Sequence, residues 1–415
     1  MKTTRRKFIG QMGLATAGTL FVPLFLKGFD SMAASSIKTS NKKLIIIQLS
    51  GGNDGLNTVI PFRNDIYYKE RPQIAIPQNE VIKLSDEQGL NPALLPLKKI
   101  YEEGELTIIN NVGYPNPDRS HFRSMDIWQT GSSSNEYLST GWLGRYLDNI
   151  HLENQNKPTH FALEMDDTLS LALKGIKKSG FAAQDLNRLK RTTSTPVVKA
   201  ILDSEKNNVA YSLKSHHEHS HDEQVSYLYQ TLSNTAASSE YLFEKNKAGK
   251  TVANYPKNRF GKDIQQVAKL INSGCDSQIY YVSLNGFDTH ANQKNAQERL
   301  FKNYAEAIEA LRKDLRKTDN WNDTLVMTFS KFGRRVGENA SRGTDHGTAN
   351  VVFLAGGDLK KKQFVGQAPN LTDLDNGDLK FKIDFRQIYS DILKNWLKTN
   401  PKSILNADFE NLGLV

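Results

Sequence analysis

Cysteine is nearly absent from this sequence, and long apolar runs and basic stripes are absent too. Cys275 is the one cysteine, so no disulfide can form within the chain, and we interpret it as a small buried side chain. After residue 34 no apolar stretch approaches the roughly 20 residues of a membrane-spanning helix. A basic stripe with interleaved aromatics is also missing, which argues against nucleic acid as a partner.

Residues 1–34 have the pattern of a twin-arginine export signal. Arg5 and Arg6 precede Phe8, and the uncharged run Met12–Leu26 follows with 15 residues. Small residues at 31–34 (S-M-A-A) suit cleavage by a signal peptidase. A membrane anchor is the alternative, but the run is short and the paired arginines favour the export route.

Export has consequences for partners and charge. We expect the twin-arginine translocase as a partner during export and a periplasmic or extracellular protein with no stable membrane span after cleavage. Five basic residues and one acidic residue leave with the signal. The formal charge therefore falls from +9 to +5, which is mildly basic and dispersed.

Apolar runs alternate with helical patterns along the rest of the chain. Five runs predict buried strands over Lys43–Ser50, Leu106–Val112, Gln278–Leu284, Thr324–Phe329 and Asn350–Ala355. Apolar residues three and four positions apart predict helices over Phe260–Ile271, Tyr304–Leu315 and Phe385–Trp396. The alternation predicts an α/β domain over residues 41–415, with a mainly parallel central sheet covered by helices on both faces.

Residues 185–258 differ in being polar and lysine-rich without a buried strand. We expect a helical insertion or a lid on the main domain. Within it, residues 216–222 read H-H-E-H-S-H-D. Such a tract can bind metal weakly, but we interpret it as a solvated polar loop.

Polar residues gather where the predicted strands end. The blocks are G-G-N-D-G at 51–55, Y-P-N-P-D-R-S-H at 114–121, N-G-F-D-T-H at 285–290, and S-K-F-G-R-R at 330–335 followed by G-T-D-H-G at 343–347. Ligands of open parallel sheets bind beyond the carboxyl ends of the strands. We therefore expect six residues to converge: Asp54, Ser120, Asp288, His290, Asp345 and His346.

The residue types in these loops indicate a metal. Asp288 and His290 stand at D-x-H spacing, and Asp345 and His346 are adjacent. Carboxylate with imidazole is a ligand mixture that zinc, manganese and iron accept, so we expect zinc or manganese before calcium. The alternative is a pair of Asx-turns that carry surface histidines.

The blocks resemble those of domain-of-unknown-function family 1501. The resemblance rests on G-G-N-D-G at 51–55, R-S-H-F and W-Q-T-G across 119–131, G-F-D-T-H at 286–290, F-G-R at 332–334 and T-D-H-G at 344–347, and spans roughly residues 40–400. That family, in which a twin-arginine leader is usual, is similar to the alkaline phosphatase and sulfatase superfamily. The resemblance implies an alkaline-phosphatase-like fold and metal ligands at Asp54, Asp288, His290, Asp345 and His346.

The same resemblance implies catalytic roles. Ser120 matches the nucleophile at a helix N-terminus, and His121 is a ligand or a hydrogen-bond donor. Arg119, Arg123 or Arg334 would hold the oxyanion, because a guanidinium matches phosphate or sulfate bidentately. Two features depart from the superfamily: no histidine follows His346, and Pro115 stands where sulfatases carry their nucleophile.

Two functions remain open at this point. The first is an exported metal-dependent hydrolase of phosphate or sulfate esters that acts on an anionic ester or glycan. The second is a secreted non-catalytic binding protein on the same fold, with a structural metal site and a polymer or an acidic glycan as its ligand.

Overall fold

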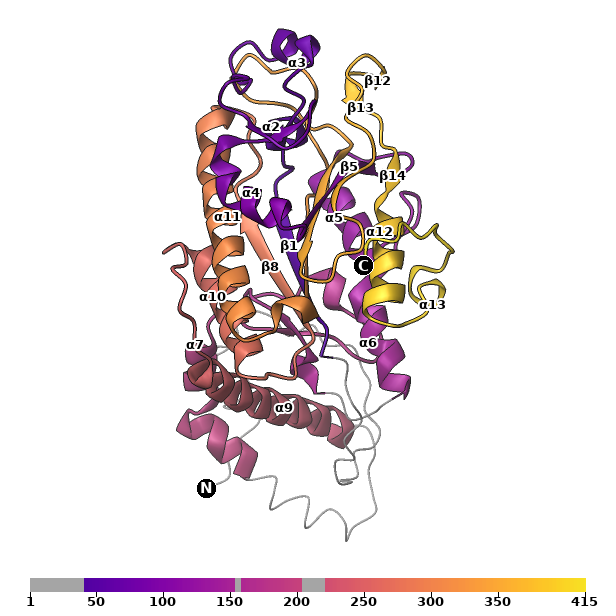
Figure 1. Ribbon diagram of the computed structural model, residues 1–415. Helices are drawn as coiled ribbons and strands as arrows, with labels where there is room; N and C mark the ends of the chain where they lie inside the picture. The colour runs from indigo at the N-terminus through magenta and orange to yellow at the C-terminus, as the bar shows by residue number, and fades with distance from the viewer. Residues whose placement is uncertain (1–40, 154–157, 204–220) are drawn as a thin grey trace.

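The computed structural model describes residues 41–153, 158–203 and 221–415 (Figure 1). A nine-stranded sheet forms the centre, in the order β11-β5-β10-β9-β1-β8-β6-β7, with β14 paired to β5. Its strands are β1 Lys43–Ser50, β5 Leu106–Gly113, β6 Ala162–Glu164, β7 Phe181–Ala182, β8 Ile279–Asn285, β9 Thr324–Phe329, β10 Asn350–Gly356, β11 Gln363–Val365 and β14 Ile383–Asp384.

Helices cover both faces of this sheet. They are α4 Leu95–Glu102, α10 Arg259–Asn272 and α11 Gln293–Lys317 on one face, and α5 His121–Thr130, α6 Trp142–Glu153, α12 Phe385–Asp391, the π-helix η5 Ile392–Trp396 and α13 Lys402–Leu405 on the other (Figure 1). The predicted α/β class with a mainly parallel sheet and helices on both faces is confirmed.

Short elements complete the chain. Two small sheets hold β2 Val59–Ile60, β3 Ile82–Lys83, β4 Gly89–Leu90, β12 Leu374–Asp375 and β13 Asp378–Leu379. The short helices are α2 Gly55–Thr58, α3 Asp65–Glu70, η1 Pro92–Leu94, η2 Thr159–Phe161, η3 Leu171–Leu173 and η4 Trp321–Asp323. In Figure 1, α2, α3, β12 and β13 lie near the upper end of the molecule, beyond the carboxyl end of β1.

Strand β1 shows why both faces of the central sheet are covered. It pairs in parallel with β8 and β9, and its side chains alternate between two cores. Ile45 and Ile47 pack into the core beneath α10 and α11, whereas Leu44 and Ile46 pack into the core beneath α5 and α12. Because both faces are buried, the strand is a continuous apolar run rather than an alternating one.

Strand β10 is antiparallel to both of its neighbours, β5 and β9, while the other pairings of the large sheet are parallel. It therefore begins at the edge where β9 ends. The connection between them, residues 330–349, stays at that edge. This brings the G-T-D-H-G block to the same side as the blocks that follow β1, β5 and β8.

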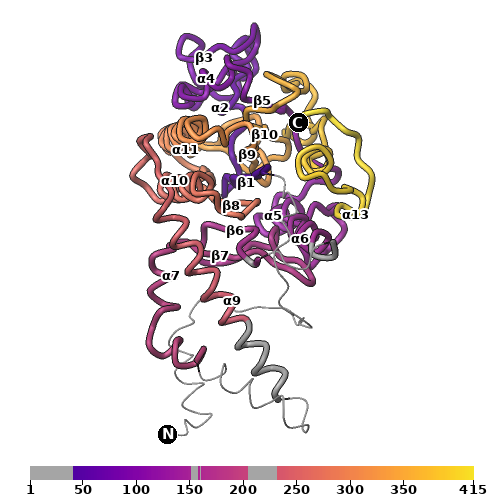
Figure 2. The backbone as a smooth tube through the Cα atoms, turned by 60° about the horizontal axis from the view of Figure 1, so that its bottom comes forward, coloured from indigo at the N-terminus to yellow at the C-terminus, as the bar shows by residue number. Residues whose placement is uncertain are grey.

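Residues 185–258 are helical where the structure describes them: α7 (Leu186–Thr193), residues 196–203 and α9 (His221–Ala248) precede α10. His160, just before β6, bonds through Nδ1 to Ser238 of α9 at 3.1 Å and stacks on Tyr241 at 4.5 Å. Its Nε2 lies 3.0 Å from Asp276, just before β8. Helix α9 thus packs at the amino edge of the sheet, away from the four blocks (Figures 1 and 2).

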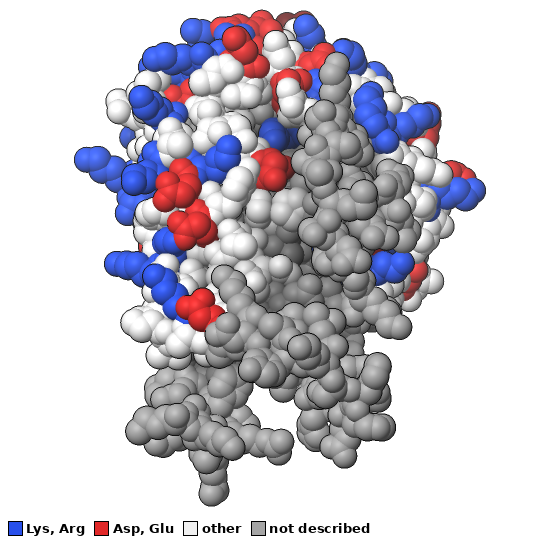
Figure 3. Space-filling model, turned by 90° about the horizontal axis from the view of Figure 1, so that it is seen from below, with Lys and Arg blue, Asp and Glu red and all other residues white. Residues whose placement is uncertain are grey.

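Four sequence-based expectations remain, on the histidine-rich tract, the surface charge, membrane-spanning helices and Cys275. Residues 216–220 of the histidine-rich tract lie outside the described residues, and His221 begins α9. Figure 3 looks at this end and shows Lys and Arg intermingled with Asp and Glu on its described part. Within the described ranges, no helix has the length and apolar character needed to cross a bilayer. Cys275 is buried, with its Sγ 3.3 Å from the Ser277 hydroxyl.

Candidate metal centre

Three imidazoles surround one carboxylate at the carboxyl edge of the sheet. Asp288 follows β8, His121 opens α5 and His346 precedes β10. The Asp288 carboxylate lies 3.4 Å from Nε2 of His121, 3.0 Å from Nε2 of His290 and 3.3 Å from Nε2 of His346. Ligand atoms of His121, Asp288 and His346 all lie within 4.8 Å of one another, close enough to share a metal ion.

Glycines allow these loops to approach so closely. Gly51 has a φ of +121°, and a Cβ built on it would stand 2.3 Å from the backbone nitrogen of Asp288. A Cβ on Gly343 would stand 2.3 Å from the carbonyl group of His290. A side chain at either position would push two of the loops apart.

His346 is held in the tautomer that a metal ligand requires. Its Nδ1 lies 2.9 Å from the carbonyl oxygen of Arg119, which can only accept, so Nδ1 carries the proton. The Nε2 lone pair then faces Asp288 and His290, whose Nε2 is 3.0 Å away. Ligating histidines commonly donate their second ring nitrogen to a backbone carbonyl in this way.

The ionisation of the cluster also suits a cation. Burial lowers the pKa of His121 and of His346, so both imidazoles are neutral at pH 7. Burial opposes ionisation of Asp288, but the hydrogen bond and positive charge of Arg334 help to lower its pKa overall. Neutral imidazoles with a carboxylate are the protonation states that bind a divalent metal, so this donor set fits zinc or manganese.

Asp345 stands behind the cluster rather than in it. Its Oδ1 is 3.5 Å from Nδ1 of His290 and accepts from the Asn339 amide at 3.3 Å. This places Asp345 beside the far nitrogen of His290, outside the group of ligand atoms around Asp288. The adjacent residues Asp345 and His346 therefore point in different directions, as neighbours in an extended segment do.

Asp54, which the resemblance implies is a metal ligand, has its carboxylate occupied by other partners. It is 1% exposed, and Arg71 donates to both of its oxygens, at 2.6 and 3.1 Å. The Gln293 amide and the Leu56 backbone N–H donate to the same carboxylate. The oxygens needed for a metal are already bound, so Asp54 anchors the loop after β1.

Two of the three predicted oxyanion-binding arginines are committed elsewhere. Arg334 is buried and donates to the carbonyls of Gly51, Gly52, Phe287 and Thr344 and to Asp288. Arg123 donates to the carbonyls of Ser133, Ser134 and Glu136 and stacks on Tyr137. Both guanidiniums hold loops in place: Arg334 donates from all three of its nitrogens, whereas Arg123 donates from Nη2 and its buried Nε has no partner among the described residues. The third, Arg119, is half-exposed and paired with buried Asp378.

Ser120 is exposed beside the cluster, one position before His121. It is the N-cap residue of α5, and its hydroxyl makes no capping hydrogen bond. Its backbone N–H instead donates to Asp118 at 2.6 Å. The hydroxyl is therefore accessible at the N-terminus of a ten-residue helix, where anions are favoured.

Lys331 and Phe332 belong to the site although the sequence did not single them out. The Phe332 ring lies 4.5 Å from the His346 ring and 5.2 Å from the His121 ring. Burial lowers the pKa of Lys331 to about 8, while the charge of Asp288 acts in the opposite direction. Both residues lie in the S-K-F-G-R-R block that follows β9, which the sequence marked as a loop of the site without giving either residue a role.

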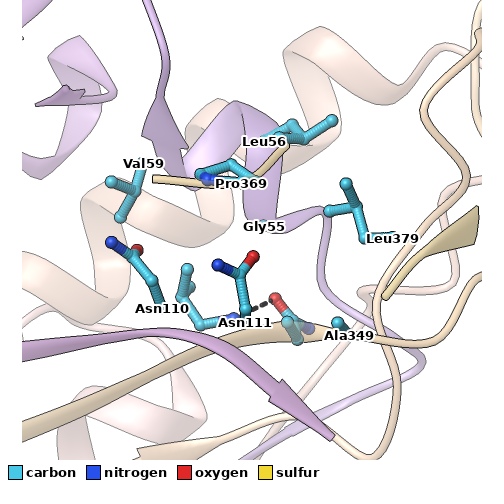
Figure 4. Close-up of a pocket in the computed structure, with 10 residues that line it drawn as sticks. Gly55, Leu56, Val59, Asn110, Asn111, Ala349, Pro369 and Leu379 are labelled. Carbon is cyan, nitrogen blue, oxygen red and sulfur yellow. Dashed lines mark hydrogen bonds between the residues drawn. The ribbon is translucent and has the colours of Figure 1, made fainter. Parts of the chain in front are cut away.

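Two cavities lie near this edge. The one in Figure 4, between Gly55, Asn110 and Asn350, offers about 10 Å³, enough for roughly one water molecule. The other, about 310 Å³, lies between residues 115–118 and 133–135 and touches Arg386. The second cavity is large enough for part of a substrate. Residues 115–118, which line it, come shortly before Ser120 in the sequence.

The sequence profile of one family matches residues 101–397, which hold every residue of the three-imidazole cluster. It is described as "Protein of unknown function (DUF1501)". The chain belongs to this family. The predicted membership is confirmed, while the DUF1501 match begins after the G-G-N-D-G block. Comparison with curated proteins gives no match.

Several solved structures share a distant likeness with this DUF1501 protein. The lipoteichoic acid synthase LtaP from Listeria monocytogenes is 10% identical over 79% of this chain and 68% of its own, with a TM-score of 0.35. The PsFucS1 sulfatase from Pseudoalteromonas sp. is 12% identical over 80% and 66%, with a TM-score of 0.33. A Vibrio parahaemolyticus protein of the alkaline phosphatase superfamily is 10% identical over 88% and 71%, with a TM-score of 0.30.

Proposed function

We propose that this protein is an exported, metal-dependent hydrolase of phosphate or sulfate esters. The observation that carries the proposal is the convergence of His121, Asp288 and His346 within 4.8 Å, with the accessible Ser120 hydroxyl beside them. His290 adds a third imidazole at 3.0 Å from Asp288. The signal at residues 1–34 would deliver the folded domain outside the inner membrane.

In this proposal the three imidazoles and Asp288 hold one divalent ion. Such an ion would polarise the ester oxygen and lower the pKa of a nearby hydroxyl. The carbonyl of Arg119 fixes the His346 tautomer, and Asp345 orients His290, so both rings keep a nitrogen directed at the cluster.

Ser120 is the proposed nucleophile. Its hydroxyl stands at the N-terminus of α5, whose free backbone N–H groups favour an anionic ester group. Because His121 follows directly, a group bound there would lie next to the metal ligands. The 310 Å³ cavity beside residues 115–118 would accept the rest of the substrate.

The test is hydrolysis of p-nitrophenyl phosphate and p-nitrophenyl sulfate by residues 35–415 reconstituted with zinc or manganese. We expect turnover of one of them and a loss of kcat/KM of at least about 100-fold in Ser120→Ala. The exposed Ser403 on α13 provides the control, since Ser403→Ala should keep wild-type activity. An inert metal-loaded protein, or full activity in Ser120→Ala, would favour the non-catalytic binding protein.

A further inference from the structure

Lys331 is a largely buried lysine whose ammonium the described residues leave unpaired. The residue is 6% exposed, yet its ammonium forms no hydrogen bond or ion pair within the described ranges. Its Nζ lies over the Phe332 ring, 5.5 Å from the ring centroid. Removing most of a charged side chain from water without a partner is costly, and buried charges in proteins are usually paired.

The position of this ammonium is next to the candidate metal centre. The Phe332 ring that it contacts also packs against His121 and His346. The charge of Lys331 acts on Asp288 and on His121, which lie on two other loops. Lys331 therefore faces the same space as the metal ligands, from the end of β9.

Other cations of the site are not available in the same way. Arg334 is saturated by backbone carbonyls, and Arg71 is bound to Asp54. Asp54 is engaged with Arg71, so its carboxylate does not offset the charge of Lys331. Among the described groups around this site, Lys331 is the buried cation whose hydrogen-bonding capacity is unused.

We propose that Lys331 is the anion-binding residue of the site and pairs with a charged oxygen of the substrate's phosphate or sulfate group. This deepens the proposed function, on which it rests, because it limits the substrate to esters that carry a negative charge beside the scissile bond. An ammonium is a point charge on a flexible stem, so it accepts either oxyanion without the planar match that arginine demands. Lys331 and the metal together would neutralise the group.

The experiment is calorimetric titration of inorganic phosphate into the mature protein, with and without zinc, in wild type and Lys331→Met. We expect wild type to bind phosphate and Lys331→Met to bind it at least 10-fold more weakly. Lys331→Arg keeps the charge and should bind within a few-fold of wild type. Lys302→Met, at an exposed position on α11, is the control and should change nothing.

Separate zinc titrations distinguish this inference from the proposed function. Phosphate binding that depends on Lys331 in a protein that binds no zinc would support the inference and remove the metallohydrolase. Zinc binding with equal phosphate affinity in wild type and Lys331→Met would overturn the inference alone, as would wild type that binds no phosphate. Should Lys331→Met fail to fold by circular dichroism, Lys331→Gln against Lys331→Arg decides in the same way.

Discussion

Asp54 and Arg71 are fully buried as an ion pair with two hydrogen bonds, and this pair defines the loop after β1. Arg71 also donates to the carbonyls of Arg335 and Val336, so it ties the first loop to the segment that leads to His346. Removing one partner of a buried pair leaves the other charge unpaired, which is strongly destabilising.

We therefore expect Asp54→Asn to act on stability and not on metal content. The free energy of unfolding should fall by about 3–5 kcal/mol in urea denaturation, while the zinc stoichiometry at saturating metal stays at the wild-type value. Loss of zinc at unchanged stability would instead return Asp54 to the metal site.

At the residue scale, the sequence indicated the residues of the imidazole–carboxylate cluster more accurately than the roles of the arginines around it. Asp288, His290 and His346 were found because each closely follows a strand or precedes one at the same edge. The arginines could not be sorted in this way, because the strand-end rule does not indicate which carbonyl or carboxylate each guanidinium contacts. Arg334, for example, donates to Gly51, 283 positions away.

Secondary-structure elements were predictable where their apolar pattern was long. The five predicted strands agree with β1, β5, β8, β9 and β10 to within one residue at each end. Strands β6, β7, β11 and β14 have two or three residues each, too few to show any period. The reversed direction of β10 left no signal in its sequence, since a strand buried on both faces looks the same in either orientation.

Helix α9 is attached to the sheet at the edge opposite the candidate metal centre. The His160 ring joins it to β6 and β8 through Ser238, Tyr241 and Asp276. In the described part of residues 185–258 these helices do not cover the site. The helical character was predictable from composition and spacing, but the edge on which the segment docks depends on contacts made by His160.

This arrangement predicts that His160→Ala affects the fold and leaves the site unchanged. A buried hydrogen bond to Ser238, a partly buried one to Asp276 and a ring stack are lost, so the free energy of unfolding should fall by roughly 2 kcal/mol. Zinc affinity should stay within about twofold of wild type in the same titration. A parallel loss of zinc affinity would mean that α9 and the metal centre are coupled.

On the scale of the whole molecule, helix α9 attaches at one edge of the sheet and the candidate metal centre lies at the opposite edge. The residues of the cluster come from loops up to 225 positions apart, between His121 and His346. They meet because parallel strands deliver their ends to one edge and β10 starts there. The DUF1501 match spans these loops.

Zinc titration of wild type and His346→Ala, with elemental analysis of both, tests the central claim most directly. The control is His160→Ala, which removes a buried histidine at the opposite edge. We predict about one equivalent of zinc per chain in wild type and in the control. In His346→Ala we predict affinity weaker by at least the roughly 10- to 100-fold typical of losing a supporting residue. A wild type that stays metal-free after reconstitution, or a His346→Ala variant that binds zinc as tightly, would contradict the account.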